Sequence, residues 1–328
     1  MLKFHRIILL AGLIFSFTRN EIQAQAIPAV NPVQLDSLIR FAEATYADEI
    51  MVLHKNRQVV HWKSGRCDSL YYGTASMMKS WTGIAVGILV DRGLIGSEED
   101  LICDYLTDWK AGCRNEVTIR NLLTMSGGFN QRSGARGILG ASDSRAYALN
   151  AEPDTLPNVR FGYSNVSVQL LGLLIEKVTG MNSDRFFREA LFEPLGMDST
   201  RLRKDRSGRN YIVYGGAYTT LQDAAQFGKM MLNKGILNGR RIVTEDWIEK
   251  STNSSGLVPY YGYLFWIDAF TENRNYAATG DLGQLTIVYP ELELVFLRRQ
   301  KCNPSKYTKM EWMGPDFVRL VASVIHQP

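Results

Sequence analysis

The chain has 328 residues, of which 45% are hydrophobic and 21% are charged, and its formal net charge is +4. This length and hydrophobic content suffice for one large domain or for two lobes around a sizeable buried core. Basic residues are interspersed with acidic ones and form no blocks, so the composition argues against a nucleic-acid partner.

The first 26 residues have the three parts of a secretory signal peptide. A basic start precedes an apolar run from Ile7 to Phe17, and the small-residue pattern Ala24-Gln25-Ala26 follows. The apolar run is shorter than the roughly 20 residues that a membrane-spanning helix needs. We therefore expect cleavage after Ala26, a mature chain of residues 27–328 without a stable membrane span, and a periplasmic or secreted location.

The first elements of the mature chain read as a helix followed by a β-hairpin. Apolar residues recur at helical spacing in NPVQLDSLIRFAEATY, residues 31–46. The runs IMVLH and QVVHW then flank Lys55-Asn56-Arg57, which is the pattern of two strands joined by a tight turn.

The stretch 73–93, GTASMMKSWTGIAVGILVDRG, places a serine one helical turn before a lysine. Its apolar spacing predicts a helix with one buried stripe that stops at Gly93, with Ser76 at or just inside its start. Residues three apart share a helix face, so the amine of Lys79 can reach the hydroxyl of Ser76. The helix dipole favours charge on the serine oxygen, and a desolvated lysine can act as a neutral base. A capping serine beside a surface lysine is the purely structural alternative.

The four cysteines are Cys67, Cys103, Cys113 and Cys302. They form no Cys-x-x-Cys pair and have no histidine at metal-ligand spacing, so we expect neither a metal nor a cofactor. In an oxidising compartment Cys103 and Cys113 can close a short loop. Four cysteines permit three pairings, however, and buried free thiols are the other possibility.

The middle of the chain is predicted to be mostly helical. We expect helices at 116–128 with a closing glycine pair, at 165–179 between a capping Asn165 and Gly180, at 183–193 before Pro194, and at 220–234 after a Thr220–Asp223 capping box. Residues 129–160 lack periodicity, and a loop of that length inside a compact domain is usually functional. We expect this loop and the residues from Tyr260 to Trp266 to shape the substrate pocket.

From residue 260 the chain reads as the short β-rich runs YGYLFWID, QLTIVYP and ELVFLRR, and Pro315 then starts a closing helix. Strands at both chain ends with helices between them predict an α+β fold. The two ends would form one antiparallel sheet flanked by helices, and the middle would form a helical lobe. We place the sheet lobe at about 27–75 and 245–328, and the helical lobe at about 76–244.

A second candidate motif, Tyr163-Ser164-Asn165, lies on the turn before the apolar helix. A tyrosine next to Lys79 would have a stabilised phenolate, which can take the serine proton and pass it to the leaving group. Asn165 can donate its amide to the substrate or hold Lys79. A turn tyrosine followed by a capping asparagine is the structural alternative.

Together these motifs resemble those of the serine β-lactamase and penicillin-binding protein superfamily, particularly its class C and esterase-like branch. Similar segments of that branch recur here in the same order: TIRNLLTMSGG, FGYSNVSVQLLGLLIEKVTG, LFEPLGMDST, GGAYTTLQDAAQFGKMMLNKG and YGYLFWI. The resemblance covers most of residues 45–300 and implies a β-lactamase/transpeptidase-like fold. It also implies that Ser76 is the acyl-forming nucleophile, that Lys79 and Tyr163 are the general base and acid pair, and that Asn165 orients the substrate.

The third motif of that superfamily is altered in this chain. Lactamases and carboxypeptidases carry Lys or His, then Thr or Ser, then Gly, whereas this chain reads Ala278-Thr279-Gly280. The glycine lets substrate approach the strand, and the backbone N–H of Asp281 can join that of Ser76 as an oxyanion hole. Because the cation is missing, hydrolysis of β-lactams or D-alanyl peptides is disfavoured.

The following Gly283-Gln284 resembles relatives that cleave esters or linear amides such as 6-aminohexanoate oligomers. The residues expected to orient the substrate or stabilise its oxyanion are Asn165, Thr279, Gly280 and Asp281.

These features predict an exported serine hydrolase that acts through an acyl-enzyme on a small-molecule or peptide-like ester or amide. The alternatives are a D-alanyl peptidase or β-lactamase, or a ligand sensor that is acylated without turnover. A Ser-His-Asp hydrolase fits less well, because the chain has no Gly-x-Ser-x-Gly elbow and its only histidine beyond residue 61 is His326. The oligomeric state stays open.

Overall fold

A computed structural model of the chain describes residues 30–130, 137–254, 256–268, 271–272, 274–306 and 314–325. The predicted signal peptide and His326 lie outside these ranges. Within them, every helix is too short or too polar to span a bilayer.

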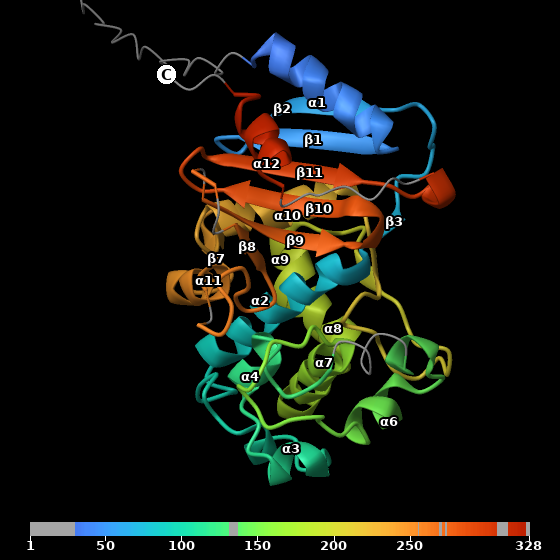
Figure 1. Ribbon diagram of the computed structural model, residues 1–328. Coiled ribbons are helices and arrows are strands. Elements are labelled where there is room, and N and C mark those ends of the chain that lie inside the picture. The colour runs from blue at the N-terminus through green and yellow to red at the C-terminus, as the bar shows by residue number, and fades with distance from the viewer. Residues whose placement is uncertain are drawn as a thin grey trace, which may run out of the picture.

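The upper lobe in Figure 1 is built on a six-stranded antiparallel sheet whose strands come from both ends of the chain. The strand order is β2-β1-β11-β10-β9-β8. The strands are β1 (Glu49–His54), β2 (Arg57–Lys63), β8 (Trp266–Asp268), β9 (Asn275–Gly280), β10 (Gln284–Tyr289) and β11 (Leu294–Arg299). Strand β1 from the N-terminal end pairs with β11, with Val52 opposite Phe296. The prediction that the two chain ends combine into one sheet is confirmed.

The β1–β2 hairpin forms as predicted, through a turn in which Lys55 and Asn56 both have positive φ. Turns of this kind match the right-handed twist of the flanking strands. The predicted strand YGYLFWID is shorter than expected, since only Trp266–Asp268 joins the sheet. Leu264 before it has φ 62°, and its N–H donates to the carbonyl of Leu123, so the chain turns there instead of extending.

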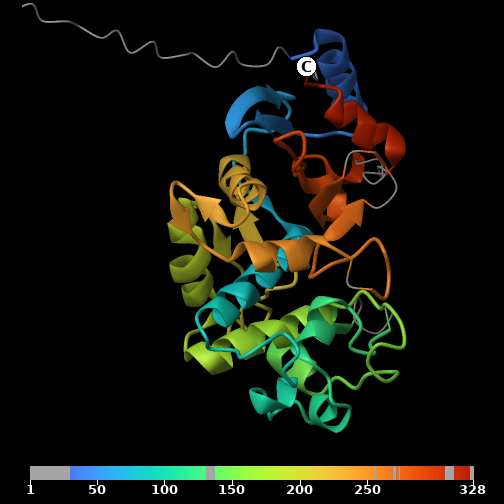
Figure 2. The ribbon, with the colours of Figure 1, turned by 90° about the vertical axis from the view of Figure 1, so that its left-hand side faces the viewer.

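Helices cover both faces of the sheet, because alternate side chains of each central strand point to opposite sides. Ile50 and Val52 of β1 face the terminal helices α1 (Pro32–Ala44) and α12 (Pro315–Ala322). Met51 and Leu53 face the other side, where α10 (Leu221–Leu232) packs on the sheet. Figure 2 shows α1 and α12 on the opposite side of the sheet from α10.

The lower lobe is mostly helical (Figure 1). Its helices are α2 (Met78–Asp91), α3 (Lys110–Arg114), α4 (Ile119–Leu123), α6 (Ser144–Leu149), α7 (Asn165–Thr179), α8 (Ser183–Phe187), α9 (Glu193–Leu195) and α11 (Glu245–Thr252). Shorter helical pieces occur in both parts of the molecule. They are the 3₁₀ turns η1 (Ala75–Met77), η2 (Ile102–Asp104), η4 (Asp281–Gly283) and η5 (Pro304–Lys306), and a π-helical turn at Arg188–Phe192. Small strands are β3 (Tyr72–Gly73), β4 (Arg201–Leu202), β5 (Ala217–Thr219), β6 (Ile236–Leu237) and β7 (Arg240–Arg241).

Helix α2 is the central helix of the molecule and is buried on every side from Met78 to Leu89. The prediction of a single buried stripe was therefore wrong. Its glycines allow this burial: a Cβ on Gly87 would lie 2.3 Å from the indole of Trp247. Lys79 is thus placed on a helix that has no solvent-facing side over most of its length.

Several helix boundaries differ from the sequence prediction. The chain passes Pro194 without stopping, since proline is tolerated in the first turn of α9, and it turns only at Gly196 with φ 69°. Helix α4 ends before the glycine pair. Residues 129–160 are not all loop, because α6 forms there with Asp143 as its cap.

Helix α10 has half of the predicted capping box. Thr220 accepts from the N–H of Asp223, but the Asp223 carboxylate accepts from Ser199 and Thr200 instead of from the Thr220 backbone.

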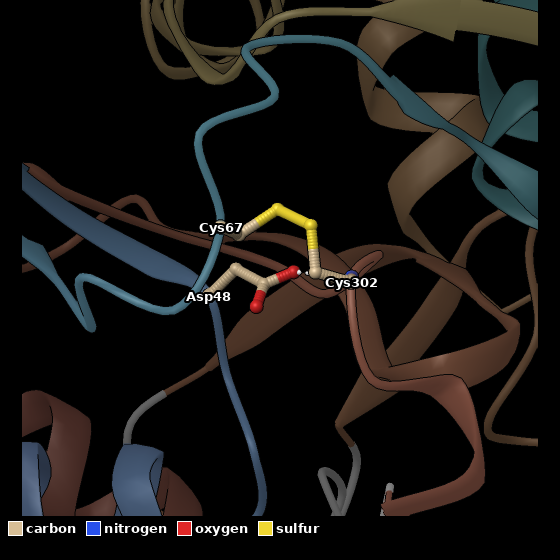
Figure 3. A group of neighbouring side chains, drawn as sticks. All are labelled: Asp48, Cys67 and Cys302. Atoms are coloured by element: carbon tan, nitrogen blue, oxygen red, sulfur yellow. Dashed lines mark hydrogen bonds between the residues drawn. A yellow bond between two sulfur atoms is a disulfide. The ribbon is translucent and has the colours of Figure 1, made fainter.

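Two disulfides, Cys67–Cys302 and Cys103–Cys113, use all four cysteines. The pairing of Cys103 with Cys113 is confirmed. Figure 3 shows Asp48 beside the Cys67–Cys302 bond. These three residues are close enough to share a metal ion, but both sulfurs are consumed by the disulfide, and Asp48 accepts from the N–H of Cys302 at 3.0 Å. The disulfide therefore links the segment between β2 and β3 to the residues that follow β11.

Candidate active site

Ser76 and Lys79 meet at the junction of η1 and α2, as their spacing predicts. Nζ of Lys79 donates to Oγ of Ser76 at 2.8 Å and to the backbone carbonyl of Tyr214 at 2.6 Å. The Lys79 side chain is 1% exposed. Its position on the buried first turn of α2 therefore aims the amine at the serine.

Burial is the cause of an unusual protonation equilibrium at Lys79. Desolvation lowers the pKa of its amine to about 7. Both of its hydrogen-bond partners are neutral oxygens, and the described residues supply no carboxylate that would restore the charged form. Near neutral pH a large share of Lys79 amines can accept a proton.

Tyr163 completes a triangle with these two residues. Its hydroxyl hydrogen-bonds to Ser76, and Nζ of Lys79 lies 5.0 Å from the centre of its ring. Burial raises the pKa of Tyr163 to about 12, and the hydrogen bond from Ser76 only partly opposes this. The expected phenolate is thus not favoured here. These opposite shifts favour a protonated Tyr163 and leave Lys79 as the group of the pair that loses its proton more readily.

Aromatic rings hold Tyr163 in place. Its ring stacks on Trp266 with centroids 5.8 Å apart and meets Tyr261 edge-on at 6.3 Å. Trp266 also stacks on Tyr260, and Phe161 contacts the same group of rings. The expectation that residues 260–266 border the site agrees with this arrangement.

Asn165 is the first residue of α7 and is 8% exposed. It does not cap the helix as predicted, because Ser164 has the extended backbone of a cap and accepts from the N–H of Ser167. Among the described residues, the carbonyl of Tyr214 rather than Asn165 holds Lys79. The Asn165 amide is left available on the turn beside Tyr163.

The end of β9 lies directly against the serine turn. A Cβ on Gly280 would stand 2.3 Å from the carbonyl oxygen of Thr74, so only glycine fits there. Thr279 is 8% exposed, and Asp281 is exposed at the start of η4. The backbone of this strand end is therefore brought next to the N–H groups at the start of α2.

Ala75, the residue before Ser76, has φ 46°. Positive φ is uncommon for alanine and costs of order 1–3 kcal/mol, so the surrounding structure must impose it. Gly280 and Gly215 both approach Ala75 closely, at 3.1 and 3.4 Å from the Cβ that each glycine lacks. Strain at this position fixes the orientation of the serine that follows.

Ala278 is 1% exposed and belongs to the core on the α2 side of the sheet. It brings no charge to the site. The missing cation of the third motif is therefore not compensated on its own strand.

One partner in the site, Tyr214, was not found from the sequence. It acts through a backbone carbonyl, which carries no residue-type signal. Trp266 was expected near the pocket as part of residues 260–266, but its stacking on Tyr163 was not predicted. Its repeated aromatic neighbours, Tyr260 and Tyr261, were the signal that could have indicated this contact.

Two cavities are bounded by described residues, and one of them shares Tyr214 with the site. One, of about 640 Å³, is lined by Phe129, by residues of 141–152 and by Val166, the neighbour of Asn165. Part of the 129–160 segment thus borders a cavity, and its expected role in the substrate pocket stays a prediction. The other, of about 270 Å³, is lined by Tyr214 and by residues 203–206.

The fold and these motifs define a class of protein. Residues 39–304 match the family described as Beta-lactamase. The chain therefore belongs to this family, within the serine β-lactamase and penicillin-binding protein superfamily.

Individual relatives share limited sequence identity with this chain. A penicillin-binding protein of Bacillus subtilis (strain 168) is 31% identical over 159 residues, which are 44% of this chain and 34% of that protein. A 6-aminohexanoate-dimer hydrolase of Paenarthrobacter ureafaciens is 23% identical over 250 residues, or 68% of this chain and 63% of that one. The matches thus span less than two thirds of either relative. A solved family VIII carboxylesterase aligns with a TM-score of 0.69 at 18% identity, over 89% of this chain and 95% of its own, which shows a shared fold.

Proposed function

We propose that this protein is an exported serine hydrolase that cleaves an ester or amide through an acyl-enzyme on Ser76. One observation carries the proposal: a buried lysine with a pKa of about 7 lies 2.8 Å from a serine hydroxyl. A serine is a weak nucleophile until an adjacent base takes its proton. The short distance to Ser76 and the lowered pKa both support Lys79 as that base.

The first half of the reaction follows from these positions. Neutral Lys79 takes the proton of Ser76 as Oγ attacks the substrate carbonyl carbon. The backbone N–H groups of Ser76 and Asp281 receive the oxyanion. Tyr163 gives its hydroxyl proton to the leaving alcohol or amine and regains one from the Lys79 ammonium. The acyl group is then bonded to Ser76, and the leaving group departs neutral.

The second half returns the enzyme to its starting state. A water molecule attacks the acyl ester, and its proton passes to neutral Lys79. The acyl–oxygen bond breaks, Ser76 regains a proton, and the carboxylic acid product leaves. Asn165, beside Tyr163, is suited to orient the substrate through its amide.

The altered third motif bears on the substrate class. A lysine at position 278 would place a cation beside a carboxylate that adjoins the scissile bond, whereas Ala278 is buried and neutral. This favours esters or linear amides over β-lactams and D-alanyl peptides. The names of the 6-aminohexanoate-dimer hydrolase and carboxylesterase relatives support the same preference.

Export is proposed from the predicted signal peptide. The two disulfides support it, because such bonds persist in oxidising compartments. A shift in mass after expression with the full leader, matching cleavage after Ala26, is the expected result. A cytosolic protein with reduced cysteines would contradict it.

The test is a panel of four substrates on the purified protein: a p-nitrophenyl ester, a linear amide, a D-alanyl peptide and a β-lactam. We expect turnover of the ester or the linear amide, with no turnover by Ser76→Ala. The Ser76 hydroxyl caps neither η1 nor α2, so this variant should keep its fold. A stoichiometric adduct without turnover would instead identify a ligand sensor.

A further inference from the structure

The smaller cavity and the site around Ser76 share one residue, Tyr214. Its backbone carbonyl accepts the hydrogen bond of Lys79, and the centre of its ring is 6.0 Å from Nζ of Lys79. Tyr214 also lines the cavity of about 270 Å³. A molecule that contacts Tyr214 in this cavity would therefore touch the residue that holds Lys79.

The cavity is basic on one side and apolar on the other. Arg203, Lys204 and Arg206 contribute positive charge, while Ile138 and Ile212 are among its apolar lining. The backbone of Arg203 is held by hydrogen bonds, while its side chain is exposed. Its N–H donates to the carbonyl of Gly216, and its own carbonyl accepts from Ile212 at 2.9 Å. Burial raises the pKa of the Tyr214 hydroxyl to about 12, and the nearby positive charge of Arg203 opposes that shift.

Asp205 is the acidic residue of this lining, and both of its carboxylate oxygens already accept hydrogen bonds from neighbouring residues. One oxygen of Asp205 accepts from the N–H and hydroxyl of Ser144 and from Asn210, and the other accepts from Ser207. Burial alone would raise the pKa of Asp205, but these hydrogen bonds outweigh it and hold that pKa well below its usual range. Asp205 thus stabilises the loop that carries Arg203, Lys204 and Arg206.

The three cations differ in their own partners. Lys204 lies over the ring of Tyr211 at 5.2 Å, and Arg206 makes a 3.5 Å contact with the carbonyl of Gly140. Within the described ranges, the guanidinium of Arg203 has neither a carboxylate nor a hydrogen-bond acceptor. A planar guanidinium binds a carboxylate through two parallel hydrogen bonds, which makes it the group of choice for such a ligand.

We infer that this cavity binds a carboxylate at the end of the substrate that is remote from the scissile bond, with Arg203 as its principal partner. The inference rests on the proposed hydrolase function. The apolar wall suits the aliphatic spacer between that carboxylate and the reacting carbonyl. Family members with a cation in the third motif can bind a carboxylate next to the scissile bond. This chain has Ala278 there and a basic cavity beside Tyr214, so its substrate's carboxylate would be bound away from the scissile bond.

The test compares each free acid with its own methyl ester. One pair is the mono-p-nitrophenyl ester of adipic acid and its methyl ester, which carry the charge on the acyl side. The other pair is the acetate ester of a hydroxyhexanoic acid and its methyl ester, which carry it on the leaving side. The quantity measured is the ratio of kcat/KM for acid over methyl ester. Taking this ratio within each variant cancels any loss of activity common to both substrates.

Wild type should prefer the free acid in one of the two pairs. Arg203→Gln should lower that ratio by about tenfold to a hundredfold, the range of a charge-assisted hydrogen bond. Arg203→Lys should recover only part of it. The matched control is Arg201→Gln, which removes the same charge from an exposed arginine over the Tyr71 ring, outside the cavity lining, and should leave the ratio unchanged.

Two results would overturn the inference. If the methyl esters are hydrolysed but Arg203→Gln changes neither ratio, the cavity does not recognise a carboxylate, and the proposed function stands. If Arg201→Gln lowers the ratio as much as Arg203→Gln, the effect is long-range attraction and not a site. Failure of wild type to hydrolyse any ester or amide would remove the proposed function itself, and the inference with it.

Discussion

Replacing Lys79 by methionine should remove both the activity and a specific pH dependence of stability. Methionine has a similar length and no charge, and Lys79 is buried in the core of the molecule. Burial lowers the pKa of the amine to about 7 in the folded state, from its ordinary value of 10.5. Between these two values the unfolded chain binds the proton that the folded protein releases.

The sign and size of the effect follow from this difference. Stability rises with pH wherever the unfolded state binds more protons, so wild type should become more stable between pH 7 and about 10.5 as the unfolded lysine loses its proton. From pH 7 to pH 9 the expected gain in the free energy of unfolding, relative to Lys79→Met, is about 2 kcal/mol. Below pH 7 the two proteins should change in parallel.

The assay is urea unfolding of both proteins at pH 7 and pH 9 with the disulfides intact. The difference between the two pH values, taken between the proteins, isolates Lys79, because other titrating groups are shared. In parallel, kcat/KM of wild type on a neutral ester should fall about tenfold per pH unit below 7 and level off above it. Identical pH dependence of stability in the two proteins would show that the pKa of Lys79 is not lowered in the folded state.

Four further perturbations test other parts of the proposed mechanism. Tyr163→Phe should lower kcat by roughly 10² to 10⁴, the usual worth of general acid–base help, with near-normal turnover pointing to a different acid. Trp266→Ala should lower kcat by opening the stack on Tyr163, whereas Trp266→Phe should retain most of it; equal kcat in both variants would show that the stack is dispensable. Ala278→Lys should shift kcat/KM about tenfold to a hundredfold toward substrates whose carboxylate adjoins the scissile bond, and an unchanged ratio would show that the missing lysine has another meaning. Treatment with EDTA should leave the hydrolysis rate unchanged, and a loss restored by a divalent ion would reveal a metal requirement.

The sequence predicted the parts of this fold that depend on local pattern. The β1–β2 hairpin, the helices at Pro32–Ala44 and Pro315–Ala322 and the pairing of the two chain ends are all present. The spacing of Ser76 and Lys79 also predicted their contact, because three residues on a helix bring two side chains together whatever surrounds them.

Features that depend on tertiary packing could not be predicted from the sequence. The apolar spacing of α2 reads as one stripe, yet its polar residues are also buried, because Ser80 and Thr82 donate to the carbonyls of Leu264 and Val213. The charge state of Tyr163 depends on how completely Trp266 and Tyr261 enclose it, which no local motif records. The carbonyl of Tyr214 and the basic cavity beside it come from a loop whose shape is decided by Asp205 and its hydrogen bonds.

The most direct test of the central claim is to locate the acyl group. The purified protein is mixed with a p-nitrophenyl ester and quenched with acid within the first turnover, then digested and analysed by mass spectrometry. We expect one added acyl mass on the peptide that contains Ser76, and none in Ser76→Ala. An acyl group on another residue, or full turnover by Ser76→Ala, would contradict it.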